Sequence, residues 1–126
     1  MPTPVSSSRA PKALGPYSAA LRAGTLLFVS GQLGLDPASG EMVKGDVAEQ
    51  TRQALRNVGA LLEEAGLSYR HVVRTTEFLA DLNDFTTMNE IYRTFFSEPY
   101  PARSTIQAAR LPRDAKVEID AIAMAD

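Results

Sequence analysis

Apolar and polar side chains alternate along this chain with two different periods, and each period predicts a different element. Over residues 47–65, apolar side chains recur at every third or fourth position, which is the spacing of one helix face. Asp46 and Glu49 match a capping box at the start of this segment, and Gly66 stands where a left-handed residue often ends a helix. The pattern therefore predicts a helix over residues 47–65.

A second, shorter helix is predicted ahead of Pro99. Four apolar side chains share one stripe at helical spacing. They are Phe85, Met88, Tyr92 and Phe95. Asp81 or Asn83 can cap the start of this helix, and Pro99 is expected to stop it because proline cannot continue a helix.

Segments with a period of two and many β-branched residues predict the strands. Residues 18–31 indicate two strands joined by a turn around Gly24, and residues 71–80 indicate a third. Near the C-terminus, residues 103–110 and 116–124 indicate two more strands with a loop between them.

The predicted elements follow the order β β α β α β β. Each helix has a single apolar stripe, so both are expected to cover the same face of one mixed sheet, which is an α+β fold of two layers. The last strand has apolar side chains on both faces, with Ile119 and Ala121 on one and Ile122 and Met124 on the other. A second subunit is the simplest cover for such a face, which predicts a homo-oligomer.

Length and composition indicate one domain over residues 1–126, without a disordered region or a membrane span. Apolar residues make up 44% of the chain and charged residues 22%, as in an average globular protein. Residues 1–12 lack the apolar region of a secretory signal, so they are interpreted as a flexible arm, and the expected location is cytoplasmic.

Net charge narrows the class of ligand. The formal charge is −2, and the thirteen Lys and Arg residues are scattered along the chain. Proteins that bind nucleic acid usually gather basic residues into a patch, because neutralising phosphates supplies most of the affinity. We therefore expect a small-molecule partner and neither a nucleic acid nor a membrane.

The side chains that carry catalysis in many enzymes are scarce here. The chain has no cysteine and one histidine, His71, which is expected to face solvent. No metal site or Ser-His-Asp triad is predicted around it, and the glycine patterns of dinucleotide and P-loop sites are absent. What remains is a set of Arg, carboxylate, Ser/Thr, Asn and Tyr side chains, which suits carboxylate binding and a positioned water.

Arg103 is the first candidate for carboxylate binding. It begins a predicted half-buried strand, and a guanidinium presents a rigid pair of donors that matches a carboxylate. Glu118 in the next strand is either a salt-bridge partner of Arg103 or a carboxylate that orients or protonates a bound ligand. Asp120 shares a nominal face with Glu118, and the residues alone do not choose between these alternatives.

Other candidate residues have simpler structural explanations beside their functional ones. Ser30 and Gly31 can present a hydroxyl and an amide to a ligand, or they can merely end a strand. Asn89 can face a pocket or solvent. Tyr17 follows Gly-Pro and can line a pocket of a neighbouring subunit or simply pack.

Four segments of the chain together carry a recognisable pattern. They are APKALGPYSAA at residues 10–20, VSGQLGLDPASGE at 29–41, TTEFLADLNDF at 75–85 and PARSTIQAARLPRDAKVEI at 101–119. The residues of these segments and their order along the chain resemble the RidA family of reactive intermediate deaminases, and the last segment is that family's signature. The resemblance implies a chorismate-mutase-like two-layer fold and a barrel-like homotrimer with ligand sites in the clefts between subunits.

The resemblance also implies an activity, the hydrolysis of reactive enamines and imines such as 2-aminoacrylate to 2-keto acids and ammonia without a cofactor. By position, it assigns carboxylate binding to Arg103 and the reacting water to Glu118 rather than Asp120. It places five further residues in the pocket, which are Tyr17, Ser30, Gly31, Asn89 and Thr105. Thr105 occupies a position that is often cysteine in the family.

Two other functions are weighed against catalysis on imines. A protein with this fold and pocket can bind small carboxylates as a regulatory module without turnover. Ribonuclease action, which is also attributed to some relatives, fits less well with the acidic balance and the scattered basic residues.

Overall fold

The capping box at Asp46 starts the long helix α1, Val47–Glu64. In the computed structural model, which describes residues 1–126, the Asp46 amide donates to Oε1 of Glu49 at 2.8 Å. The Asp46 side chain accepts in return from the helix backbone. Gly66 follows the end of the helix with a φ of 77°, a left-handed conformation that glycine adopts without strain. The predicted long helix is confirmed.

The second helix, α2, spans Phe85–Arg93, and both of its predicted boundaries are wrong. Asp81 caps a short 3₁₀ turn, Leu82–Asp84, that precedes the helix, so neither Asp81 nor Asn83 caps α2 itself. At the other end the helix stops well before Pro99, where the Thr94 hydroxyl donates to the backbone at 2.6 Å.

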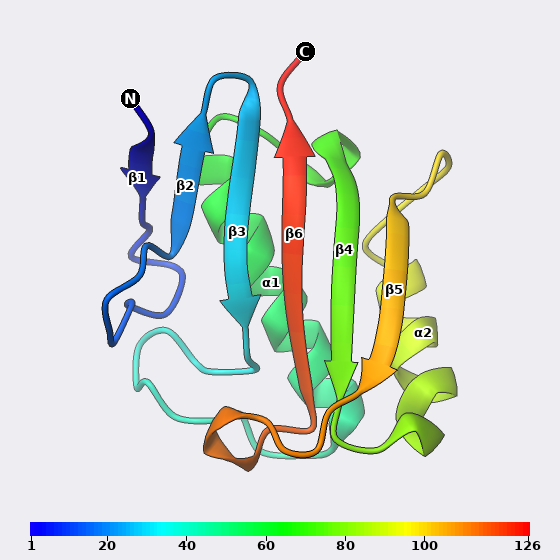
Figure 1. Ribbon diagram of the computed structural model, residues 1–126. Coiled ribbons are helices and arrows are strands. Elements are labelled where there is room, and N and C mark those ends of the chain that lie inside the picture. Colours follow the sequence, from blue (N-terminus) through cyan, green and yellow to red (C-terminus); the bar gives the residue numbers. More distant parts are fainter.

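Six strands form one mixed sheet in the order β1-β2-β3-β6-β4-β5 (Figure 1). Strands β4 and β5 are parallel because α2 crosses between them, and all other neighbours are antiparallel. The strands are β1 (Thr3–Val5), β2 (Ala20–Ala23), β3 (Leu26–Gln32), β4 (Val72–Leu79), β5 (Ala102–Gln107) and β6 (Val117–Met124). The five predicted strands and the mixed sheet are confirmed.

Strand β1 lies inside the segment that the sequence suggested to be a flexible arm. Its three residues pair with β2 at the edge of the sheet, where Thr3 is opposite Arg22 and Val5 is opposite Ala20. Pro4 fits this place because an edge strand does not need every backbone donor.

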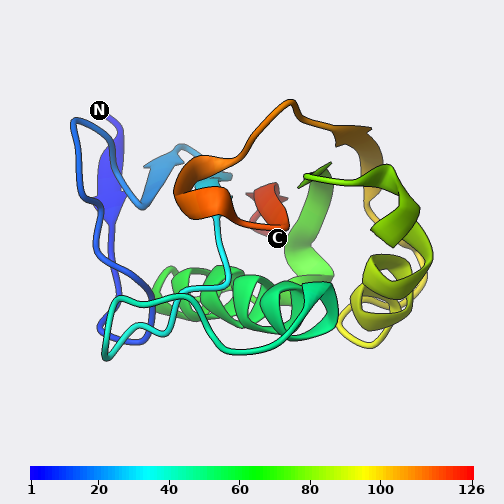
Figure 2. The same cartoon turned by 90° about the horizontal axis from the view of Figure 1, so that it is seen from below.

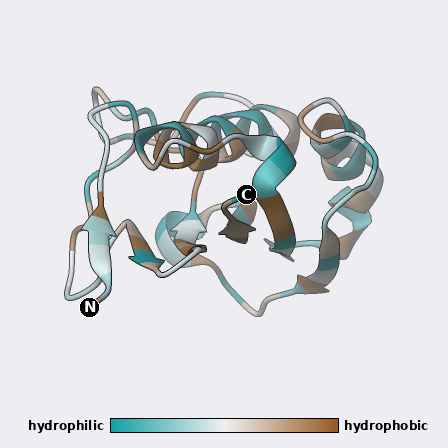
Figure 3. Cartoon of the chain, turned by 90° about the horizontal axis from the view of Figure 1, so that it is seen from above, coloured by the Kyte–Doolittle hydropathy of each residue, from teal (hydrophilic) through white to brown (hydrophobic).

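Both helices pack on one face of the sheet, as predicted (Figure 2). The hydrophobic side of α1 turns toward the strands (Figure 3), where Leu55 and Leu62 belong to the same buried cluster as Leu27 and Ile119. Burying such side chains completely stabilises the fold by about 1.5–3 kcal/mol each. Neither helix combines the length and apolar character needed to cross a membrane.

The opposite face of the sheet has no helix over it. Large apolar side chains are exposed there, including Phe28 on β3, Ile106 on β5 and Met124 on β6. The last strand is thus apolar on both faces at its C-terminal end, as predicted, although Glu118 and Asp120 make the beginning of the uncovered face polar.

Candidate functional site

Strand register decides which candidate residues can meet. On β5, Arg103 lies beside the fully buried Thr75 of β4, and Thr105 lies beside Glu77, so Arg103 and Thr105 belong to the helix-covered face. On β6, the residues on either side of Glu118 are buried under the helices, so Glu118 belongs to the opposite face. The sheet therefore separates Arg103 from Glu118 within one chain, and the predicted alternative of an ion pair between them is wrong for a single subunit.

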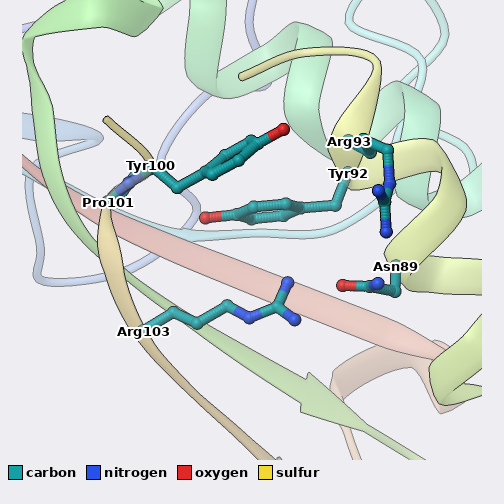
Figure 4. A pocket seen from close by; sticks show the side chains of 6 residues that line it. All are labelled: Asn89, Tyr92, Arg93, Tyr100, Pro101 and Arg103. Carbon is teal, nitrogen blue, oxygen red and sulfur yellow. The ribbon is translucent and has the colours of Figure 1, made fainter. Parts of the chain in front are cut away.

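Arg103 lies in a cavity of about 260 Å³ between α2 and β5, here called the arginine cavity (Figure 4). The cavity is lined by Asn89, Tyr92, Arg93, Tyr100, Pro101 and Arg103. The guanidinium carbon of Arg103 is 4.8 Å from the centre of the Tyr92 ring and 5.5 Å from that of Phe85. Aromatic faces attract a cation at such distances, so these two rings help to hold the guanidinium in place. The prediction that Asn89 faces a pocket with Arg103 agrees with this arrangement.

Arg103 has a buried acidic neighbour, Glu77, that was not among the residues singled out from the sequence. Glu77 of β4 is fully buried, and its Oε1 is 3.9 Å from Nε of Arg103. The Thr105 hydroxyl donates to the same oxygen at 3.2 Å. Burial raises the pKa of the Glu77 carboxyl, and the side chains of Thr75, Arg103 and Thr105 offset part of this effect. Thr105 thus reaches the site through Glu77 and does not line the cavity.

The remaining candidates gather at a second cavity of about 500 Å³, here called the glutamate cavity. Tyr17, Ser30, Gly31 and Glu118 are among its lining residues. The Ser30 hydroxyl donates to the backbone carbonyl of Ser18 at 2.6 Å, which fixes the loop before β2 against β3. The family resemblance placed these four residues in one pocket with Arg103 and Asn89, whereas in a single chain they line a cavity apart from Arg103.

Gly31 and Glu118 are in close contact. A Cβ atom on Gly31 would overlap the Glu118 carboxylate, so the absence of a side chain at residue 31 makes room for that carboxylate. Burial raises the pKa of Glu118 above its ordinary value, and the nearby charge of Asp120 raises it further. A carboxylate with a raised pKa is suited to accept and return a proton.

His71 is not solvent-facing, which corrects the prediction. Its side chain is only 9% exposed and lies between Ser68 and Asp126. The Ser68 backbone amide donates to Nδ1 at 3.0 Å, and Nε2 is 3.2 Å from the Asp126 carboxylate. Because a backbone donor already occupies Nδ1, this nitrogen does not serve as a base for the Ser68 hydroxyl. No group of three or more His, Cys, Asp or Glu side chains is arranged to hold a metal ion.

Comparison with known proteins identifies the family. The family model described as Endoribonuclease L-PSP matches residues 7–125. The chain belongs to this family. A 2-iminobutanoate/2-iminopropanoate deaminase from Mus musculus is 51% identical over 120 residues, which cover 95% of this chain and 89% of that protein.

Solved structures connect the Endoribonuclease L-PSP family to the Rid proteins. A Yersinia pestis protein of the Rid family superposes with a TM-score of 0.96 at 38% identity, covering 99% of this chain and 100% of its own. Escherichia coli TdcF, solved with bound serine, gives a TM-score of 0.93 at 45% identity, with 98% and 99% of the two chains covered. The resemblance to the RidA family is therefore confirmed.

Proposed function

We propose that this chain is a cofactor-independent deaminase that hydrolyses 2-iminobutanoate, 2-iminopropanoate and related 2-aminoacrylate-type enamines. The observation that carries the proposal is Arg103, whose side chain is 27% exposed and lines a cavity of about 260 Å³. A guanidinium held in this way matches the carboxylate that every such substrate carries. The similarity to the mouse deaminase supports the same reaction class.

The proposed complete site lies between subunits of a homotrimer. In one chain the sheet separates the arginine and glutamate cavities, so a neighbouring subunit is needed to bring a Glu118 to an Arg103. The uncovered sheet face, with Phe28, Ile106 and Met124 exposed, supplies an apolar surface for this association. Light scattering after size exclusion should give the trimer mass, and a monomer or dimer would contradict the proposal.

Mixed trimers test the shared site directly. Trimers of Arg103→Ala and trimers of Glu118→Gln should each be nearly inactive, whereas unfolding and refolding them together should restore activity. At equal amounts, about one quarter of the interfaces would combine an intact Arg103 with an intact Glu118. If the mixture stays as inactive as its components, the two residues act within one subunit or not at all.

In the proposed mechanism, Arg103 binds the substrate carboxylate and so fixes the position of the imine carbon. Glu118 of the neighbouring subunit accepts a proton from a water molecule as the water oxygen bonds to that carbon. The resulting carbinolamine takes up protons at nitrogen and loses ammonia, and the carbon–oxygen double bond of the 2-keto acid forms. Water is the only co-reactant. Glu118 passes the proton that it accepted to the substrate nitrogen, and the second water proton follows as the carbon–oxygen double bond forms, so both protons leave in ammonia and Glu118 is a carboxylate again.

A trapping assay tests the activity. An amino-acid oxidase generates 2-iminopropanoate in the cuvette, and semicarbazide converts the free imine to a semicarbazone that absorbs light. The wild-type protein is expected to reduce the rate of semicarbazone formation while ammonia is released at the same overall rate. A folded trimer that leaves the semicarbazone rate unchanged would contradict the proposed function.

Binding without turnover is the second candidate, favoured by the serine bound to Escherichia coli TdcF. Serine carries a carboxylate, as the imino acids do, and Arg103 offers the same partner to both. In this case Arg103→Ala abolishes binding of a small carboxylate, Glu118→Gln leaves it intact, and the semicarbazone assay shows no effect. The family description names an endoribonuclease, so RNA cleavage that Arg103→Ala removes would favour that reaction instead.

Gly31→Ala is expected to reduce turnover more than it reduces stability. The added Cβ forces the Glu118 carboxylate to move, but that carboxylate ends a flexible side chain and can swing aside. We expect kcat to fall about tenfold or more, and the free energy of unfolding in urea to change by less than about 1 kcal/mol. In a Glu118→Gln background the same substitution should cause little further loss, because the group that it displaces is already inactive.

A further inference from the structure

The carboxylate of Glu77 is buried where an apolar side chain would be the usual choice. It belongs to the face of β4 that packs under the helices, on the same side as Thr75 and Leu79, and it is fully buried. Its Oε2 is also buried and has no hydrogen-bond partner. A carboxyl group in such a place destabilises the fold unless it interacts with a specific partner, and replacing it with a hydrophobic residue often stabilises a protein.

The partner is the one arginine that the proposed function requires. Glu77 faces the Nε side of Arg103, with Oε1 at 3.9 Å from that nitrogen. The rings of Tyr92 and Phe85 lie against the guanidinium group. The terminal amino groups of Arg103 extend past these contacts into the arginine cavity (Figure 4).

Other side chains hold Glu77 itself in position. The Thr105 hydroxyl donates to Oε1 at 3.2 Å, which keeps this oxygen on the side of Arg103. The Thr75 and Tyr92 hydroxyls share a hydrogen bond of 2.9 Å, and the Tyr92 ring lies against the guanidinium of Arg103. Strands β4 and β5 and helix α2 therefore fix the carboxylate and the guanidinium relative to each other.

We propose that Glu77 is a positioning residue for Arg103, which holds the Nε edge of the guanidinium so that both terminal amino groups face the substrate carboxylate. This inference rests on the proposed function, in which Arg103 is the carboxylate-binding group. A long arginine side chain has several rotamers in a cavity of this size, and fixing one of them before the substrate arrives reduces the entropy lost on binding.

Two substitutions separate positioning from packing. Glu77→Leu has a similar volume and no acceptor, so Arg103 loses its partner while the core stays filled. We expect KM for 2-iminopropanoate to rise about three- to tenfold, because Arg103 binds the substrate carboxylate less well. We expect kcat to stay within about twofold, because Glu118 still activates the water molecule. Glu77→Gln keeps an oxygen for Thr105 and Arg103, and its KM should return to within about twofold of the wild-type value.

A purely structural role predicts the reverse order. The leucine would then be tolerated with an unchanged KM, and the glutamine would be the worse variant because its buried amide lacks partners. Equal KM values for wild type and Glu77→Leu would overturn the proposal. Glu64→Leu, at an exposed position on α1, is the matched control for loss of one negative charge.

Proton exchange at Arg103 tests the same inference without relying on turnover. In ¹⁵N-labelled protein, the Nε–H signal of Arg103 is identified by its absence in Arg103→Lys. Its exchange with water should be about tenfold faster in Glu77→Leu than in wild type, and near the wild-type rate in Glu77→Gln. Unchanged exchange in the leucine variant would refute positioning by Glu77, whereas an inactive wild type with the expected exchange would refute only the deaminase function.

Discussion

Arg103→Ala is expected to lower kcat/KM for 2-iminopropanoate by about 30- to 4000-fold. Removing a partner from a charge-assisted carboxylate interaction costs about 2–5 kcal/mol, and each 1.4 kcal/mol corresponds to a factor of ten. In this protein the substitution also leaves Glu77 buried without its cation, so part of the effect appears as lost stability. Steady-state kinetics and urea unfolding of the same preparation separate these two effects.

Arg103→Lys tests whether charge alone is sufficient. Lysine keeps the positive charge but loses the paired donors and the flat group that lies against Tyr92. We expect an intermediate kcat/KM, with the loss mainly in KM. Arg56→Ala, which removes an exposed arginine from α1, is the control for net charge and should leave the kinetics unchanged. Full activity in Arg103→Ala would contradict the assignment of the carboxylate-binding group.

The long helix could be predicted from the sequence because its signals are local. Periodicity, the capping box at Asp46 and the glycine at residue 66 all lie within the helix or next to it. Strand β1 has no such signal, since its three residues include Pro4 and become a strand only through pairing with β2. Helix α2 ends at Arg93, where the backbone amide and hydroxyl of Thr94 bond to carbonyls of the last turn, whereas the sequence pattern pointed to the more distant Pro99.

The two cavities could not be predicted because β5 reverses the usual pattern. Its polar residues Arg103 and Thr105 lie on the helix-covered face, whereas Ile106 lies on the uncovered face and is 48% exposed. A hydrophobic pattern alone would place β5 the other way round and bring Arg103 to the side of Glu118. Only the pairing of Thr75 with Arg103 shows the true arrangement.

Glu77 had a signal that the sequence reasoning did not use. It stands at period two between Thr75 and Leu79, and these three positions of β4 are buried by the helix layer. A carboxylate at such a position needs a cation or several donors nearby. The identity of that cation depends again on the register between β4 and β5, which the sequence does not specify.

Glu118→Gln is expected to separate binding from turnover. The glutamine fills the same space beside Gly31 but accepts no proton, so kcat should fall about 100- to 10,000-fold, while KM changes by no more than about threefold. Binding of pyruvate as a product probe, measured by calorimetry, should be retained in Glu118→Gln and lost in Arg103→Ala. A glutamine variant with wild-type kcat would show that the water is activated by another group.

The pH dependence of kcat gives a second measure of the same carboxylate. If Glu118 acts as a base, kcat falls as pH decreases through its pKa, and burial together with Asp120 places this fall at a higher pH than for an ordinary glutamate. Asp120→Asn removes the neighbouring negative charge, so the pKa of Glu118 decreases and the variant should retain more of its maximal kcat at low pH than the wild type. An acid limb that Asp120→Asn leaves in place, or moves to higher pH, would mean that a group other than Glu118 controls it.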